Sequence, residues 1–394
     1  MPVAGFALFG AFWGVWGASL PRVQAHAGVG VAGLGVALLW IGAGALVTIR
    51  WAGGVSDRVG RWALPAALAT LGAASVLPVL ARGVPALSAA LFVVGLCSGA
   101  ADATINAAAV RAEHSGKPLM NLCHGVFSAS VVVASLAVAA LVGGGHGPPW
   151  SLAVVGALIV AASFALLAVG QRTPELDPDP DPPIARGPRR RVLSRPLLIL
   201  GGLAAVAYLV ENAWQSWAAI QLHSSAGASV HTAAAGPAVF AGAAAFGRFS
   251  GHAVAARVTP RKLVAAGAVT AAVGSAAAAL ATAPATVMAG IAIAGCGTAV
   301  CAPTLISLSR RHAPPADYGA ATGTVVTIAY LGFVFGPALV GLAAGVLSLR
   351  AALLGVAGAA LLLAAASAAL PQPRSRIQTV TGPSSQERAE NERT

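Results

Sequence analysis

The chain has 394 residues, of which 57% are hydrophobic and only 9% are charged. This composition, with a mean hydropathy of +0.79, excludes a soluble globular protein with a charged surface and indicates a membrane protein. The net charge of +12 would suit a nucleic-acid-binding protein, but the basic residues lie between apolar stretches. We therefore interpret the charge as a sign of membrane topology, with the lipid bilayer as partner and no nucleic acid.

About twelve apolar stretches are long enough to span a membrane, since a spanning helix needs about 20 residues. Their approximate limits are residues 3–21, 29–49, 62–80, 86–109, 120–142, 150–170, 197–221, 232–252, 263–281, 285–309, 319–343 and 350–370. Lipid cannot satisfy unpaired backbone groups, and these stretches are too uniformly apolar for barrel strands. The predicted fold class is therefore an all-α membrane protein with twelve transmembrane helices.

Basic side chains accumulate in alternate connections between these stretches. If the N-terminus is cytoplasmic, the outer loops hold only Arg22, Arg82 and Arg350. Because cytoplasmic loops carry an excess of Lys and Arg, we expect both termini to be cytoplasmic.

One polar segment divides the chain. Residues 171–196 are rich in Pro, Asp and Arg, which predicts an extended cytoplasmic linker. Six-helix bundles are then expected at residues 1–170 and 197–370, followed by a disordered cytoplasmic tail at residues 371–394.

The two halves also share a tryptophan pair. Trp13 and Trp16 recur as Trp214 and Trp217, with the same spacing in each half. Such a repeat predicts two pseudo-symmetric bundles with a solute site between them near the membrane midplane.

Two acidic side chains lie inside apolar stretches, Asp102 in the fourth and Glu211 in the seventh. A carboxylate at this depth is costly, and it usually faces a bundle interior or a wet cavity. Asn106 follows Asp102 by about one helical turn, so the amide and the carboxylate share a helix face. Because burial disfavours the charged form, we expect Asp102 to carry a proton, with a structural hydrogen bond as the alternative.

Polar and aromatic side chains near these acids are the candidates for contact with a solute. They are Asn106, Glu211, Asn212, Trp214, Gln215, Trp217, His124 and Tyr330. A few polar groups in apolar walls are what a small hydrophilic solute requires. The alternatives are an outer-vestibule charge for Glu211, interfacial anchors for Trp214 and Trp217, and a boundary position, which we favour, for His124.

The segment between the second and third stretches reads GGVSDRVGR, from Gly53 to Arg61. It resembles the GxxxDRxGRR loop of the major facilitator superfamily. The resemblance implies a conformational latch that closes in one state and opens in the other, formed by Gly53, Asp57, Arg58, Gly60 and Arg61. Arg248 begins a degenerate second copy, in which His252 stands where an acidic residue is typical. Whether His252 restores or abolishes that second latch stays open.

Asp102 followed by Asn106 resembles the fourth helix of the fucose-permease branch, where the acid belongs to the proton and sugar site. Glu211 and Asn212, with Tyr330, are similar to the YbjJ-like bacterial inner-membrane members, except that their second acid is absent here. The resemblance implies the fold of the superfamily, a multi-pass location in the bacterial inner membrane, a monomer, and no cofactor other than a proton gradient.

The expected function is a secondary active transporter that moves a small hydrophilic solute, such as a sugar-like metabolite, by proton symport and alternating access. An efflux antiporter for drugs or metabolites is the alternative, although the Gly-Pro-rich motif typical of its fifth helix is missing. A non-transporting sensor is the alternative from another class. The chain has no HExxH, Walker or GxSxG motif, so we expect neither an enzyme nor a metal site.

Overall fold

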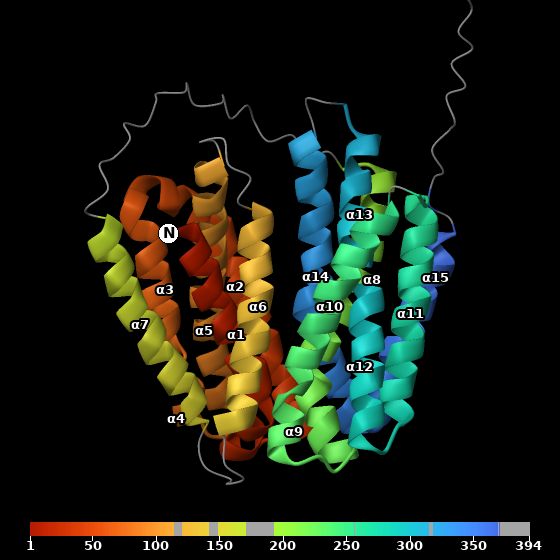
Figure 1. Ribbon diagram of the computed structural model, residues 1–394, viewed down its shortest axis with the longest axis horizontal. Coiled ribbons are helices and arrows are strands. Elements are labelled where there is room, and N and C mark those ends of the chain that lie inside the picture. The colour runs from red at the N-terminus through yellow and green to blue at the C-terminus, as the bar shows by residue number, and fades with distance from the viewer. Residues whose placement is uncertain are drawn as a thin grey trace, which may run out of the picture.

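The computed structural model describes residues 1–113, 120–141, 149–170, 193–255, 257–314, 318–368 and 370. Within these ranges the regular secondary structure is helical and includes no strand. Twelve helical segments in the described residues are long and apolar enough to cross a membrane, which confirms the predicted number and the all-α class (Figure 1).

The first half is built from seven α-helices and one short 3₁₀ turn within the described residues. They are α1 (Pro2–Ala27), α2 (Val31–Val59), η1 (Gly60–Trp62), α3 (Ala63–Ala74), α4 (Leu77–Leu80), α5 (Gly83–Glu113), α6 (Met120–Leu141) and α7 (Trp150–Gly170). The predicted stretch 62–80 is divided between α3 and α4. Pro78 has no N–H with which to continue the hydrogen bonding of α3, so the helix breaks before it.

The second half contains more interruptions. Its elements are α8 (Arg195–Ile220), the π-helical η2 (Gln221–Ser225), α9 (Val230–Ala234), α10 (Gly236–Ala255), α11 (Pro260–Leu280), α12 (Pro284–Thr298), α13 (Cys301–Ser307), η3 (Leu308–His312), α14 (Tyr318–Val346) and α15 (Leu349–Ser367). The predicted stretch 232–252 is split before Pro237, and the stretch 285–309 is split four residues before Pro303. The missing proline N–H explains both breaks.

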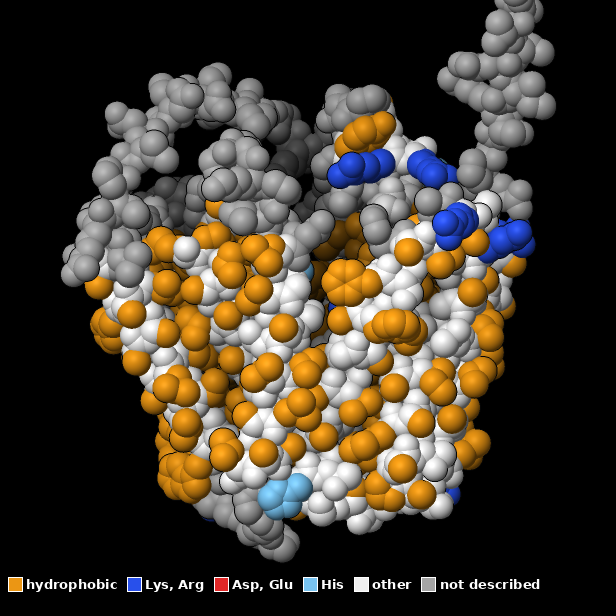
Figure 2. All heavy atoms as spheres, viewed as in Figure 1, with side chains coloured by type: hydrophobic (Ala, Val, Ile, Leu, Met, Phe, Trp, Pro, Cys, Tyr) orange, Lys and Arg blue, Asp and Glu red, His pale blue; other side chains and the backbone are white. Residues whose placement is uncertain are grey.

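The two halves lie next to each other, α1–α7 on one side and α8–α15 on the other (Figure 1). Described Lys and Arg side chains gather at one end of the second half (Figure 2). They include Arg195, Arg257, Arg261, Lys262, Arg310 and Arg311. We call this end of the molecule the basic end, and the other the closed end.

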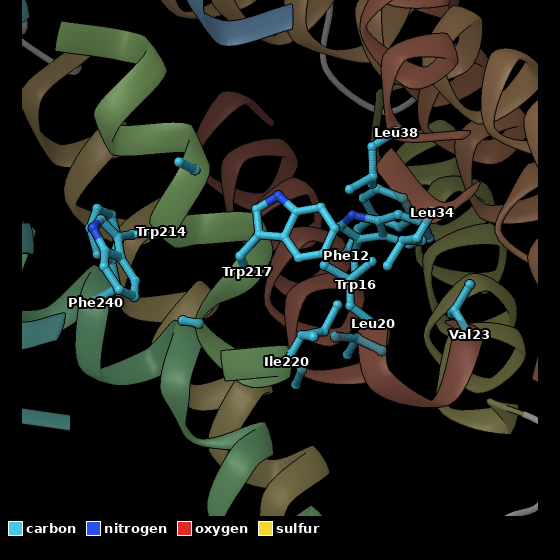
Figure 3. Packing of buried hydrophobic residues seen from close by; sticks show 14 of the residues in the cluster. Phe12, Trp16, Leu20, Val23, Leu34, Leu38, Trp214, Trp217, Ile220 and Phe240 are labelled. Carbon is cyan, nitrogen blue, oxygen red and sulfur yellow. The ribbon is translucent and has the colours of Figure 1, made fainter. Parts of the chain in front are cut away.

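Buried side chains join the halves at the closed end. One hydrophobic cluster contains Trp16 and Leu34 from the first half together with Trp217 and Ile220 from the second (Figure 3). A second cluster, around Leu197 near the start of α8, is drawn from the second half alone. The halves therefore share a core at the closed end.

Backbone contacts seal the closed end further. A Cβ atom added to Gly35 of α2 would lie 2.6 Å from the Cα atom of Gly341 of α14, so the two helices touch backbone to backbone. His231 of α9 donates from Nδ1 to the carbonyl oxygen of Ala139 at the end of α6, at 2.7 Å. Small residues allow this kind of close helix packing in lipid.

The segment predicted to form the latch is largely helical. Helix α2 continues to Val59, ten residues past the predicted end of its stretch, and Gly60 turns the chain with a φ of +60°. The side chains of Asp57, Arg58 and Arg61, with the surroundings of Gly53, lie outside the described residues. So do the side chain of His252, most of the predicted linker and the predicted tail, and the latch stays a prediction.

Candidate functional site

A cavity of about 290 Å³ lies between the two halves. Its walls are formed by α1, α2, α5 and α6 of the first half and by α8, α10 and α14 of the second. The surface is hollowed between the halves on the side of the basic end (Figure 2). The cavity is therefore the space that the closed end shuts off on one side.

Asp102 stands in the first-half wall, on α5. The side-chain amide of Asn106 donates to the Asp102 Oδ1 atom at 3.0 Å and to the Asp102 carbonyl oxygen at 2.9 Å. Asn106 itself does not line the cavity, so it holds the carboxylate from behind. Tyr330 of α14 interacts with the Asp102 carboxylate from the opposite half. The predicted sharing of one helix face by Asp102 and Asn106 is confirmed.

Glu211 and two amides stand in the second-half wall, on α8. Gln215 donates from Nε2 to the Glu211 Oε1 atom at 3.3 Å, which is a contact across one helical turn. Asn212 donates to the carbonyl oxygen of Phe333 on α14 and is thereby fixed in place. Of this group, Gln215 is the side chain most open to the cavity.

Arg248 of α10 also lines the cavity, although its sequence position suggested a latch at the membrane surface. Its Nη2 atom lies 2.7 Å from the Glu211 Oε1 atom and forms an ion pair with it. Helix α10 continues for seven residues beyond Arg248, about 10 Å at the rise of an α-helix, which places the guanidinium inside the bundle. The acidic residue in α8 was the signal that could have predicted this partner.

His124 of α6 lines the cavity as well. Its ring packs edge to face against that of Phe6, with centroids 5.0 Å apart. Arg248 lines the same cavity, and its positive charge interacts electrostatically with the imidazole. The imidazole is thus a polar group in an otherwise aromatic part of the wall.

The two tryptophans of α8 do not line the cavity. Trp214 and Trp217 are fully buried, and each indole N–H already has a partner. The Trp214 Nε1 atom donates to the Ser275 hydroxyl at 2.8 Å, and the Trp217 Nε1 atom donates to the Pro337 carbonyl oxygen at 3.0 Å. Trp217 points toward the first half beside Trp16, within the shared core (Figure 3).

Aromatic side chains of the first half line the cavity instead. Phe6, Phe9, Trp13 and Trp16 form a stripe along α1, and Phe127 of α6 continues it. The ring centroids of Phe9 and Trp13 are 6.2 Å apart, and those of Phe9 and Phe127 are 5.8 Å apart. Their spacing of three and four residues along α1 is a helix-face signal that sequence reasoning missed.

The site thus combines one carboxylate without a cationic partner among the described residues, one ion pair, several amides and hydroxyls, and an aromatic wall. Within the described part of the chain, no group of three or more His, Cys, Asp or Glu side chains could hold a metal ion. The arrangement suits reversible binding of a polar molecule and of a proton.

Comparisons with known proteins show the family to which the chain belongs. Residues 203–388 match the family profile described as Major Facilitator Superfamily. An uncharacterized MFS-type transporter of Yersinia pestis is 30% identical over 370 residues, which cover 92% of this chain and 93% of the relative.

Solved structures agree in fold. A variant of the nucleoside transporter NupG has a TM-score of 0.78 at 13% identity, and the similarity covers 94% of this chain and 99% of that one. A bacterial homologue of the human lysosomal transporter Spinster, in an inward-facing and occupied conformation, has a TM-score of 0.73 at 19% identity, over 93% and 95% of the two chains. This chain belongs to the major facilitator superfamily, and it is a multi-pass transporter of the bacterial inner membrane rather than an enzyme.

Proposed function

We propose that the protein is a proton-coupled symporter that moves a small hydrophilic solute across the membrane by alternating access. The observation that carries this proposal is the position of Asp102, whose carboxylate lines the cavity between the two halves and meets Tyr330 of the opposite half. A group placed there contacts both halves, so a change in its charge acts on the interface that must rearrange during transport.

The two acids of the cavity differ in what neutralises them. Glu211 is paired with Arg248, whereas the polar partners of Asp102 in the described residues, Asn106 and Tyr330, are uncharged. Closing the cavity over an ionised Asp102 would bury an unpaired charge, which is costly. Protonation removes that cost. Asp102 is therefore the group whose proton would permit the change between outward-open and inward-open states.

The remaining walls support a polar solute with at least one apolar face. Gln215 and the hydroxyls of Ser98, Ser128 and Ser216 offer hydrogen bonds along the cavity. The stripe on α1 offers aromatic faces, on which a ring can stack. A molecule with hydroxyl or amide groups on its rim and C–H groups on its faces fits both walls.

The direction in which the cavity opens follows from the charge distribution. Lys and Arg gather at the basic end, and cytoplasmic loops carry an excess of these residues. We place the basic end in the cytoplasm, so the structure represents an inward-open state. We assign no cofactor, since the proton gradient supplies the energy, and a monomer suffices because one chain forms the whole cavity.

The test is transport by the purified protein in liposomes. Counterflow with a panel of labelled sugars, amino acids, nucleosides and organic acids identifies the solute, and an imposed inward proton gradient should then drive its accumulation. Asp102→Asn mimics the protonated acid, so it should retain counterflow and lose accumulation. Thr104→Ala is the matched control, because Thr104 lies on the same helix and, among the described residues, its hydroxyl bonds only the carbonyl oxygens of Ala100 and Ala101. Gradient-driven accumulation by the Asp102→Asn variant at the wild-type level would disprove the coupling role.

One observation favours a second candidate, a proton-coupled efflux antiporter. The stripe on α1, with Phe127 and Phe240, could hold an apolar compound without any hydrogen bond. Such a protein would protect cells against toxic apolar compounds, and Asp102→Asn would abolish the protection. Accumulation of a hydrophilic solute in the liposome experiment decides for the symporter.

A further inference from the structure

The Glu211–Arg248 ion pair is asymmetric in its exposure. The side chain of Glu211 is 8% exposed and that of Arg248 is 44% exposed, so the guanidinium lies between the carboxylate and the open cavity. The pair shares a single short contact, from the Arg248 Nη2 atom to the Glu211 Oε1 atom. Gln215 donates to the same oxygen. The carboxylate is thus fixed behind a cation that faces the solute space.

The charges around the cavity can be counted from its lining. It contains two carboxylates, Asp102 and Glu211, one guanidinium, Arg248, and one imidazole, His124. With a neutral imidazole, the net charge is −1 when Asp102 is ionised and zero when Asp102 is protonated. Without Glu211, the same lining would be neutral or positive, and an unpaired guanidinium would face the solute.

We propose that the Glu211–Arg248 pair is a charge filter that keeps anions out of the central cavity, and that the transported solute is uncharged. Low-dielectric walls focus the field of charges in a cleft, so one unit of charge changes the local concentration of small ions strongly. Arg248 alone would attract carboxylates and phosphates, because its planar donors match them. Glu211 cancels that attraction before a solute arrives.

Charge balance selects the uncharged solute. This step rests on the proposed symport, in which Asp102 is protonated when the solute is bound. The loaded cavity is then neutral only if the solute has no net charge, and neutrality matters because the cavity must close and lose its water. An anion would leave one uncompensated negative charge, and a cation one positive charge.

The test reads the charge of the cavity directly and needs no transported solute. Trp13 and Trp16 line the cavity, so quenching of their fluorescence by iodide, caesium and acrylamide reports the local concentration of an anion, a cation and a neutral molecule. The measurement is made on the full chain in uncharged detergent at constant ionic strength. Trp13→Phe, introduced into each variant, isolates the contribution of Trp13 from tryptophans outside the cavity.

Glu211→Gln should raise the iodide-to-acrylamide ratio of the Trp13 contribution roughly threefold or more, since it unmasks Arg248. Arg248→Gln should lower this ratio and raise the caesium ratio by a similar factor. Gln215→Ala removes the other hydrogen bond to the Glu211 Oε1 atom without changing the charge, and it should leave both ratios unchanged. If Glu211→Gln fails to yield a monodisperse protein, Arg248→Gln replaces it as the test. The expected result is then a lower iodide ratio and a higher caesium ratio.

Two outcomes would overturn the filter. One is an unchanged iodide ratio in a folded Glu211→Gln variant, together with an unchanged caesium ratio in Arg248→Gln. The other is a wild-type cavity in which iodide quenches Trp13 as efficiently as acrylamide does. A protein that shows the expected quenching but no gradient-driven uptake would contradict the symporter and leave the filter standing, so the two proposals fail separately.

Discussion

The two halves carry the same pair of tryptophans and use them differently. Trp13 and Trp16 of α1 line the cavity, whereas Trp214 and Trp217 of α8 are fully buried and hydrogen-bonded. The positions that face the cavity on α8 are Glu211, Asn212, Gln215 and Ser216. One helix therefore presents aromatic rings to the solute space and its counterpart presents polar groups.

The residues of α1 that correspond to Glu211 and Gln215 in the repeat are Gly10 and Gly14. Both pack against α6, and a Cβ atom added to Gly14 would lie 2.5 Å from the carbonyl oxygen of Val131. The face that packs in α1 is thus the face that meets the cavity in α8. The cavity-facing positions of α8 lie one to two residues later in the repeat than Phe9 and Trp13 of α1, which corresponds to a rotation of roughly 100–200° about the helix axis. An internal repeat places a helix in its bundle without fixing its rotation.

The largest loss of stability is expected from the removal of a buried tryptophan. Trp217→Ala should lower the free energy of unfolding by about 3–5 kcal/mol, because it opens a cavity in the shared core and leaves the Pro337 carbonyl oxygen without its donor. Thermal unfolding in detergent measures the loss. Trp13→Ala, which removes the more exposed tryptophan of the pair in α1, should cost much less, since Trp13 is only partly buried. Equal losses in the two variants would refute the distinction.

A smaller change tests Trp214 alone. Ser275→Ala leaves the buried indole N–H of Trp214 without an acceptor, and it should destabilise the protein by about 1–3 kcal/mol. Ser163→Ala is the matched control: Ser163 is similarly buried, and within the described part of the chain its hydroxyl bonds only the Ile159 carbonyl oxygen of its own helix. The difference in unfolding temperature between the two variants is the measurement. A control that loses as much stability as Ser275→Ala would show that the indole is not the cause.

The same comparison explains how much the sequence could predict. The apolar stretches and the acid in each half predicted twelve spans, the shared face of Asp102 and Asn106, and the cavity positions of Glu211, Asn212 and Gln215. Helix α8 is surrounded by other helices, so its apolar pattern marks no single face, and nothing in it distinguished Trp217 from a wall residue. Arg248 was assigned to a latch because its partner, Glu211, lies on another helix, although the acid in α8 was a signal for a basic partner. The helix breaks, in contrast, could have been read from Pro78, Pro237 and Pro303.

The two halves also differ in the hydrogen bonds that their buried acids accept. Glu211 accepts hydrogen bonds from Arg248 and Gln215, whereas within the described residues of its own half Asp102 accepts one side-chain bond, from Asn106. Asn106→Ala should therefore lower proton-driven accumulation roughly twofold to tenfold, which corresponds to the loss of about one net hydrogen bond. Counterflow should stay unchanged, because Asn106 lies outside the cavity lining. A parallel loss of counterflow would mean that Asn106 supports the fold rather than the carboxylate.

The smallest expected effect concerns the aromatic wall itself. Trp13→Leu should weaken binding of the solute found in the counterflow screen by roughly twofold to tenfold, as expected when one stacking contact of about 0.5–1.5 kcal/mol is lost. The unfolding temperature should change little, in contrast to Trp217→Leu, which removes an indole from the shared core. Trp150→Leu is the control for tryptophan loss in general, because Trp150 is 60% exposed on the outside of the bundle. Equal solute affinity in wild type and Trp13→Leu would move the binding site away from α1, and the polar wall of α8 would then have to hold the solute alone.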